Sequence, residues 1–262
     1  MYSVVEQNLR SAMRCYGFIG NGSETREYPG LTIASSGLNV PVFNSAMLTS
    51  HPSNLDTLIT TADLHYRTRK LGWTFWVCDD MVPASLRDRG MRTVFRSQGM
   101  SRIASPPGMY AEEISARVKP PAPLTFARVC TEDTRLEFAH IASIVFSLPF
   151  GTSKRIYGAT GLWESPSYGW VGYFKGKAVA IVTIVIASDA IGVYSLGTLP
   201  EYQGRGFGET LLRHAIDDAS QRTGLRRSVL QSTQQGINLY LRLGYRIVTN
   251  FSIYVREGCA SF

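Results

Sequence analysis

The sequence predicts an α/β (α+β) fold in which a mixed, mostly antiparallel central sheet is flanked by helices, with two such domains in tandem. Its 262 residues reach the length at which one core stops growing and two ordinary domains become the usual arrangement. Residues 167–199 contain long apolar stretches separated by turn residues, as in an antiparallel meander. A proline-rich break also divides the chain near its middle.

The break lies in residues 116–125, where Pro120, Pro121 and Pro123 fall within four positions. Proline fixes φ and lacks a backbone donor, so neither a helix nor a central strand is expected to continue through it. We therefore expect two domains, residues 1–118 and residues 119–262.

In the second domain, apolar spacing and turn residues predict alternating strands and helices. The turn signals at 175–177 and 188–189 divide the apolar region into three antiparallel strands, of which the middle one is buried on both faces. Thr131 and the acidic residues after it are typical of a helix start. The expected order is strand 124–129, helix 131–146, three strands within 167–199, a glycine-rich connection 200–208, helix 209–222 ended by Gly224, strand 227–230, short helix 235–243 closed by Gly244, and one or two strands within 245–255.

The first domain shows a similar rhythm. We expect strands near 31–34, 40–48 and 73–78, and helices near 54–71 and 84–98, the last with Pro83 at its first position. Phe95, four residues before Gly99, repeats the arrangement of Tyr240 and Gly244. This echo leaves two readings open, a degenerate copy of the second domain or an unrelated helper fold.

Composition excludes several classes of protein. A hydrophobic fraction of 44% with 18% charged residues is globular rather than disordered or fibrous. The net charge of +7 is spread, with 13 basic and 10 acidic residues in 1–120 and 14 and 10 in the rest, and no basic run exceeds two residues. We therefore expect no nucleic-acid partner, although an anionic small molecule would be attracted.

The cysteines and the apolar runs point to an ordinary intracellular protein. Cys15, Cys78, Cys130 and Cys259 are more than 50 residues apart, without the paired spacing of a zinc or redox site. Glu6 interrupts any secretory signal, and the apolar run 178–187 is too short to span a bilayer. We expect a cytoplasmic location, no membrane partner and no metal.

The residues that carry chemistry form a glycine-rich loop, Gln203-Gly204-Arg205-Gly206-Phe207-Gly208, between a predicted strand and a predicted helix. Glycines permit positive φ and let backbone N–H groups approach a ligand closely. Free N–H groups at a helix start favour a phosphate or pyrophosphate. The sequence therefore predicts an anion site here.

Other phosphate and catalytic motifs do not fit. The dinucleotide fingerprint would need glycine where Glu209 stands, and no Gly-Lys pair is followed by Ser or Thr, as a Walker loop requires. A nucleophile elbow at Ser195 would need glycine in place of Val193.

The loop and the residues after it resemble the GNAT superfamily of N-acetyltransferases. The family's acetyl-CoA motif, Gln/Arg-x-x-Gly-x-Gly/Ala after the fourth strand, matches residues 203–208 without a gap, preceded by the common Pro-Glu-Tyr at 200–202. Residues 229–233 match the fifth strand, and residues 238–245 match the helix whose tyrosine, here Tyr240, commonly faces the thioester. The resemblance covers about residues 124–256.

The resemblance implies an acetyl-CoA-dependent N-acetyltransferase acting on a primary amine by direct attack. Tyr240 would act as general acid toward the departing thiolate, because a phenol is still protonated at neutral pH. The implied cofactor-binding residues are Leu196, Gly197, Thr198, Gln203, Gly204, Arg205, Gly206, Phe207, Gly208 and Asn238. Gly197 is expected at a bulge that separates the fourth strand from the fifth.

Several residues keep two readings. Asn238 either contacts the cofactor or caps its helix. Glu164, Asp189 and Glu201 are the carboxylates nearest the expected cleft in sequence, and none is assigned as the base, since a water molecule could relay the proton. His140 and His214 are expected to be structural.

The alternative function is a non-catalytic acyl-CoA-binding sensor or regulatory module. Only the enzyme requires a proton donor and an open acceptor cleft, and Tyr240 favours it. The expected partner is a small-molecule or peptide amine, with the first domain shaping its site and without binding CoA itself. The sequence leaves the acceptor's identity and the oligomeric state open, a homodimer being one option.

Overall fold

The computed structural model describes residues 1–117 and 122–256. Its strands form one twelve-stranded sheet in the order β1-β2-β3-β4-β12-β6-β11-β10-β9-β8-β7, with β5 pairing with β12 beside this path. The strands are β1 Glu24–Tyr28, β2 Leu31–Ser35, β3 Asn44–Leu48, β4 Thr74–Cys78, β5 Met100–Ala104, β6 Pro107–Ala111, β7 Thr125–Arg128, β8 Ser167–Phe174, β9 Lys177–Ala187, β10 Ala190–Thr198, β11 Ser228–Gln231 and β12 Arg246–Arg256. The α-helices are α1 Tyr2–Arg14, α2 Leu55–Thr68, α3 Arg89–Ser97, α4 Glu132–Val145, α5 Phe150–Tyr157, α6 Phe207–Thr223 and α7 Ile237–Arg242.

The second half is built on the meander β8-β9-β10. Both connecting turns hold residues at positive φ, Lys175 and Gly176 in the first and Ser188 and Asp189 in the second. Such turns match the twist of paired antiparallel strands, which explains why the turn signals fix the strand ends. Seven consecutive residues of β9, 179–185, are buried, which confirms the prediction that the middle strand is covered on both faces.

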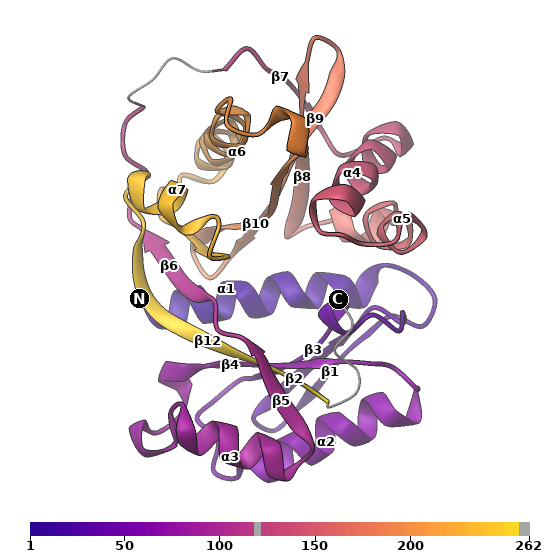
Figure 1. Ribbon diagram of the computed structural model, residues 1–262, viewed down its shortest axis with the longest axis vertical. Coiled ribbons are helices and arrows are strands. Elements are labelled where there is room, and N and C mark those ends of the chain that lie inside the picture. Colours follow the sequence, from indigo (N-terminus) through magenta and orange to yellow (C-terminus); the bar gives the residue numbers. More distant parts are fainter. Residues whose placement is uncertain (118–121, 257–262) are drawn as a thin grey trace.

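Helices cover both faces of these strands. Phe138 of α4 packs with Ile181 on one face, and Leu211 of α6 packs with Val182 on the other. Alternation along β9 places Ile181 and Val182 on opposite faces, so the two helices lie on opposite sides of the sheet. Figure 1 shows α1 running between the two halves of the molecule.

Strand β12 connects the two halves because it pairs with strands of both. It pairs with β6 from Arg246 to Asn250 and with β4 from Phe251 to Val255, both in antiparallel register. β6, which belongs to the first half of the sequence, lies between β12 and β11. Each half thus completes the sheet of the other, and a fragment beginning at residue 119 would lack the neighbour of β11.

Most predicted elements are confirmed, and the differences have local causes. The predicted helix 84–98 is a 3₁₀ turn, Ala84–Leu86, followed by α3, because Asp88 at φ 53° interrupts the helical path. Pro83 precedes this turn rather than beginning α3. The predicted strand 40–48 starts with a 3₁₀ turn before β3. The elements α1, β1, α5, β5 and β6 were not predicted.

Two sequence predictions fall outside the described residues. The boundary between 1–118 and 119–262 lies at residues 118–121, so this division stays a prediction, and Cys259 lies in the C-terminal residues. Within the described ranges Cys15 and Cys78 are buried and Cys130 is exposed, each as a free thiol.

Candidate active site

The sheet opens between β10 and β11. These parallel strands pair at only two positions, Ile191 with Ser228 and Gly192 with Val229, although both strands continue. Beyond Gly192 the edge of β10 that faces β11 therefore has no strand partner. Such an edge accepts an extended chain by backbone hydrogen bonding.

A bulge in β10 accompanies this opening, as the sequence predicted. The register with β9 shifts between Tyr194 and Gly197, and Ser195 takes a positive φ of 47°. The extra residue bends the strand away from its neighbour. Gly197 itself is required by packing, since a Cβ there would lie 2.8 Å from Val145 Cγ1 of α4.

The glycine-rich loop follows β10 and leads directly into α6. Gly204 and Gly206 have φ values of 75° and 77°, and a Cβ on either would meet no atom within 4 Å. Their conformation, not lack of space, therefore requires glycine. Gln203 Nε2 donates to Thr198 O over 3.0 Å, which ties the exposed loop to the end of β10.

The first turn of α6 is left uncapped. Gly206 occupies the N-cap position without a side-chain hydrogen bond, so the backbone N–H groups of residues 207–209 lack intrahelical acceptors. The one acidic residue of this turn, Glu209, accepts from Arg213 Nε over 2.9 Å. Its negative charge is thereby compensated, and the helix start favours a phosphate group.

Tyr240 lies on α7, which follows β11 after a short connection. The side chain is 9% exposed and packs against Tyr245, with ring centroids 5.6 Å apart. Burial raises the pKa of Tyr240 to about 12, so the hydroxyl stays protonated at neutral pH. This hydroxyl has no hydrogen-bond partner within residues 1–117 and 122–256.

The remaining predicted residues are exposed or engaged elsewhere. Asn238 is exposed and does not cap α7, whose N-cap residue is Gly236. Asp189 pairs with Arg227 over 3.7 Å and Glu201 with Lys177 over 3.6 Å, while Glu164 is exposed. None of the three carboxylates is held at the opening by a contact.

The two histidines of the second half, His140 and His214, differ in their surroundings. His214 stacks on Phe126 with ring centroids 3.9 Å apart, and burial lowers its pKa. His140 is exposed, with its ring 6.0 Å from that of Phe150.

Two further side chains lie beside the opening, Asn8 of the first half and Tyr157 of the second, and sequence reasoning located neither. Asn8 of α1 donates to the carbonyl oxygens of Ala187 and Ala190 over 2.8 and 3.2 Å, and it accepts from the Tyr194 hydroxyl over 2.7 Å. Tyr157 of α5 places its hydroxyl 3.5 Å from Ser195 Oγ at the bulge. Tertiary packing alone brings these groups together, so no sequence signal marks them.

Gln231, the last residue of β11, was also missed. It is paired in register with Gly108 of β6, and its amide oxygen and nitrogen are both buried without a partner in the described part of the chain. Paired residues of adjacent strands share a face, and a Cβ on Gly108 would contact Val5 of α1. Gln231 therefore stands beside the opening on the face covered by α1.

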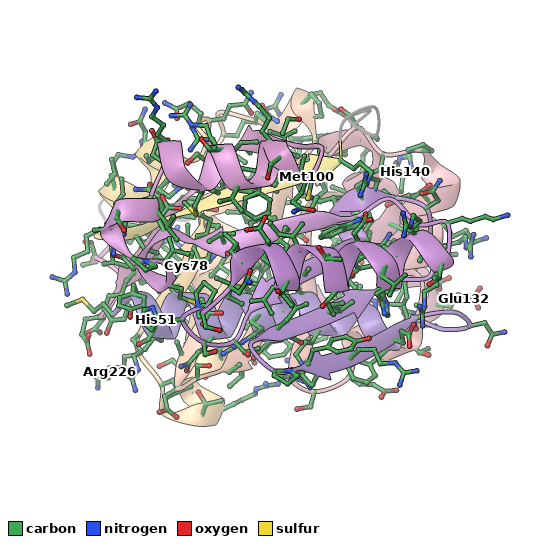
Figure 2. The ribbon with its side chains drawn as sticks, turned by 90° about the horizontal axis from the view of Figure 1, so that it is seen from below. His51, Cys78, Met100, Glu132, His140 and Arg226 are labelled. Carbon is green, nitrogen blue, oxygen red and sulfur yellow. The ribbon has the colours of Figure 1, made fainter. Side chains whose placement is uncertain are left out.

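The described residues contain neither a metal-binding cluster nor a helix able to cross a membrane. In Figure 2, His51 and Cys78 lie on the opposite side of the view from Glu132 and His140, and no group of three or more His, Cys, Asp or Glu side chains in the described ranges is arranged to hold a metal ion. No helix in those ranges has the length and apolar character needed to cross a membrane.

Comparison with known families agrees with this geometry. The sequence profile of the acetyltransferase (GNAT) family matches residues 136–245, which include the uncapped helix start and Tyr240. These residues form a GNAT-family domain. Among curated proteins, none matches the chain.

Solved structures extend the likeness to the whole chain at the level of fold. A GCN5-related N-acetyltransferase from Kribbella flavida is 16% identical, with a TM-score of 0.73 over 98% of this chain and 95% of its own. A functionally unknown conserved protein from Staphylococcus epidermidis ATCC 12228 is 14% identical, with a TM-score of 0.62 over 91% and 96%. A tandem GNAT protein from the clavulanic acid biosynthesis pathway is 12% identical, with a TM-score of 0.56 over 97% and 92%. The first half therefore has a GNAT-like fold.

Proposed function

We propose that this protein is an acetyl-CoA-dependent N-acetyltransferase that transfers an acetyl group to a primary amine by direct attack. The observation that carries the proposal is the opening between β10 and β11, which runs from the uncapped start of α6 toward the bulge at Ser195. An extended thioester with a phosphate end fits such an arrangement. The family match supports acyl-CoA chemistry at the same residues.

The residues present fit the cosubstrate. The N–H groups of residues 207–209 would hold the pyrophosphate. Gly204 and Gly206 have no side chains that could obstruct it. Leu196, Gly197 and Thr198 lie on the part of β10 that has no β11 partner, and their backbone would bond to the pantetheine arm there as an added strand does. Gln203, Arg205, Phe207 and Gly208 complete the loop, and exposed Asn238 would approach from α7.

Tyr240 would donate a proton to the leaving sulfur. Its burial disfavours the phenolate, so the hydroxyl is available as a donor across the neutral range. The same burial would raise the pKa of the CoA thiol, so that the pKa values of the phenol donor and of the thiol shift in the same direction. The amine proton would leave through water, because none of Glu164, Asp189 and Glu201 is held at the opening by a contact.

The first half would shape the acceptor side. Asn8 fixes the Tyr194 hydroxyl and the start of β10. Backbone carbonyls held by a buried amide do not move freely, so α1 would keep the bulge in position for attack. The acceptor would be a small-molecule or peptide amine that enters beside α1.

An acceptor panel tests this function. Polyamines, amino acids, amino-acid amides, short peptides and aminoglycosides would be incubated with acetyl-CoA, and free thiol release would be followed against the rate without acceptor. We expect one class to raise thiol release well above background. If acetyl-CoA binds while no acceptor raises the rate, the acyl-CoA sensor is the better description.

A further inference from the structure

A patch of aromatic and basic side chains adjoins the glycine-rich loop. We call it the hairpin patch, and its members are Phe174, Lys175 and Lys177 of the β8–β9 hairpin with Tyr202 and Arg205 of the loop. Lys177 Nζ and Arg205 Cζ lie 5.2 and 5.4 Å from the centroid of the Tyr202 ring. Lys175 Nζ lies 5.4 Å from the Phe174 ring centroid, and the two aromatic rings are 6.3 Å apart.

The hairpin patch is strongly positive. Lys175, Lys177 and Arg205 are all exposed. Among the residues that the structure describes, one carboxylate contacts them, Glu201, which lies 3.6 Å from Lys177 with both side chains more than half exposed. Such an exposed ion pair is weak, so it leaves the lysine free to exchange partners.

The hairpin patch lies beside the uncapped N-terminus of α6, the proposed pyrophosphate site. The Phe174 ring is 5.0 Å from the ring of Phe207, the first residue of α6, whose N–H is one of the uncapped donors. The tight turn through Lys175 and Gly176, at φ 50° and 78°, holds the lysines at this place. A ligand with a pyrophosphate on α6 would therefore present its next substituents to the patch.

We propose that the hairpin patch binds the 3′-phosphate of CoA and so makes this protein prefer CoA over its 3′-dephospho form. The inference rests on the proposed function, since it concerns the same cosubstrate. Ammonium and guanidinium groups form charge-assisted hydrogen bonds with a phosphomonoester, which offers a dianion and three acceptor oxygens. The half-buried Tyr202 ring supplies a face for the adenine.

Calorimetric titration with CoA and with 3′-dephospho-CoA tests the proposal. The wild-type protein is expected to bind CoA about tenfold more tightly, the effect of a few exposed charge pairs acting together. In the double variant Lys175→Gln, Lys177→Gln this ratio should fall to within about threefold, while the affinity for 3′-dephospho-CoA changes little, because both lysines lie outside the glycine-rich loop. The preference for CoA should also weaken with added salt in the wild type.

Matched controls separate the possible results. Lys70→Gln removes an exposed lysine of the first half and should keep the wild-type ratio. Lys175→Gln alone changes only the hairpin tip and serves if the double variant does not fold. Equal wild-type affinity for the two ligands, or an unchanged ratio in the folded variants, would overturn the inference and leave the proposed function standing. Absence of any CoA binding would overturn both.

Discussion

The helices α2 and α6 occupy equivalent places in the two halves, yet they begin differently. Each follows a strand that pairs in parallel with the strand after the helix, β3 with β4 and β10 with β11. At α2, the side chain of Asn54 accepts from Thr57 N over 3.1 Å, and Asp56 stands in the first turn. At α6, Gly206 provides no cap.

The capped start of α2 serves the stability of the helix, whereas the uncapped start of α6 is available for a ligand. A capped helix start has its orphan N–H groups satisfied by the chain itself, which stabilises the helix and leaves little for a ligand. An uncapped start with two left-handed glycines leaves the same groups for an anion. The first half therefore contributes to the fold, whereas the second carries the proposed site.

A second contrast lies in the helix that follows. Phe95 of α3 is fully buried and stacks on Tyr254 with ring centroids 3.7 Å apart. Tyr240, its counterpart in the sequence echo, retains a hydroxyl without a partner in the described residues. Phe95 thus has no polar group at the position where the second half would use the Tyr240 hydroxyl.

The end of β3 in the first half is covered by α1. Arg10 Nη1 donates to Leu48 O over 3.3 Å, and Glu6 lies 3.6 Å from the same guanidinium. Glu6 is 4% exposed, and its Oε1 has no partner among the described residues. A buried carboxyl group is thus linked through Arg10 to the end of β3, the strand that precedes α2 as β10 precedes α6.

The largest effect is expected on kcat, when Tyr240 is replaced by phenylalanine, the residue that stands at position 95 in the first half. Tyr240→Phe keeps the ring and its packing but removes the donor. Loss of a general acid typically lowers rates about 10²- to 10⁴-fold, so kcat should fall in that range while CoA affinity stays near wild type. Steady-state kinetics on the best acceptor checks this, and a kcat within about threefold of wild type would mean that Tyr240 is not the acid.

Glu6→Gln should change stability by the next largest amount. Burial, opposed by Arg10, raises the pKa of Glu6 from 4.5 to about 7, so the folded protein keeps its proton to higher pH than the unfolded chain. Stability is therefore lost as pH rises from about 4.5 to about 7, by about 3 kcal/mol at most. The neutral amide should be more stable than wild type at pH 8, and this advantage should vanish toward pH 4.5. Urea unfolding across this range checks it, and a difference independent of pH would contradict the assignment.

Gly206→Glu should make the start of α6 unable to bind an anion. Acetyl-CoA at a hundredfold excess over Kd should stabilise the wild-type protein by about 2.7 kcal/mol. The variant places a carboxylate at the proposed pyrophosphate site and forces a side chain into the left-handed region of φ. The stabilisation by acetyl-CoA should therefore disappear. Thermal unfolding with and without ligand measures it, and an intact shift in the variant would place CoA elsewhere. Calorimetry of the wild type should give one site per chain, because α2 is capped.

Asn54→Ala should have the smallest effect. It removes the cap of α2 and so tests whether an uncapped start is enough to bind an anion. Losing the cap should destabilise the protein by about 1 kcal/mol. It should create no second CoA site, because Asp56 and the absence of glycines still disfavour an anion at α2. Unfolding curves and binding stoichiometry measured together test both statements. Two sites per chain in this variant would show that the cap alone had blocked the first half.

The sequence by itself predicted most of the local elements and the positive φ of the glycine-rich loop. Turn residues fixed the ends of β8, β9 and β10, and Thr131 fixed the start of α4 through its hydrogen bond with Thr134 N. The spacing of Gly204 and Gly206 predicted a loop with positive φ. These features are local, since each depends on residues within a few positions of one another.

Only the tertiary structure decided which strands are neighbours and what surrounds the opening. A period-two pattern shows that β12 is a strand but not that its first part pairs with β6 and its second with β4. The hydrogen bonds of Asn8 with β10 join positions that are remote in sequence. The place of the Gln231 amide beside the opening depends on the register between β11 and β6. Packing between the halves determines both, and no local sequence pattern encodes such packing.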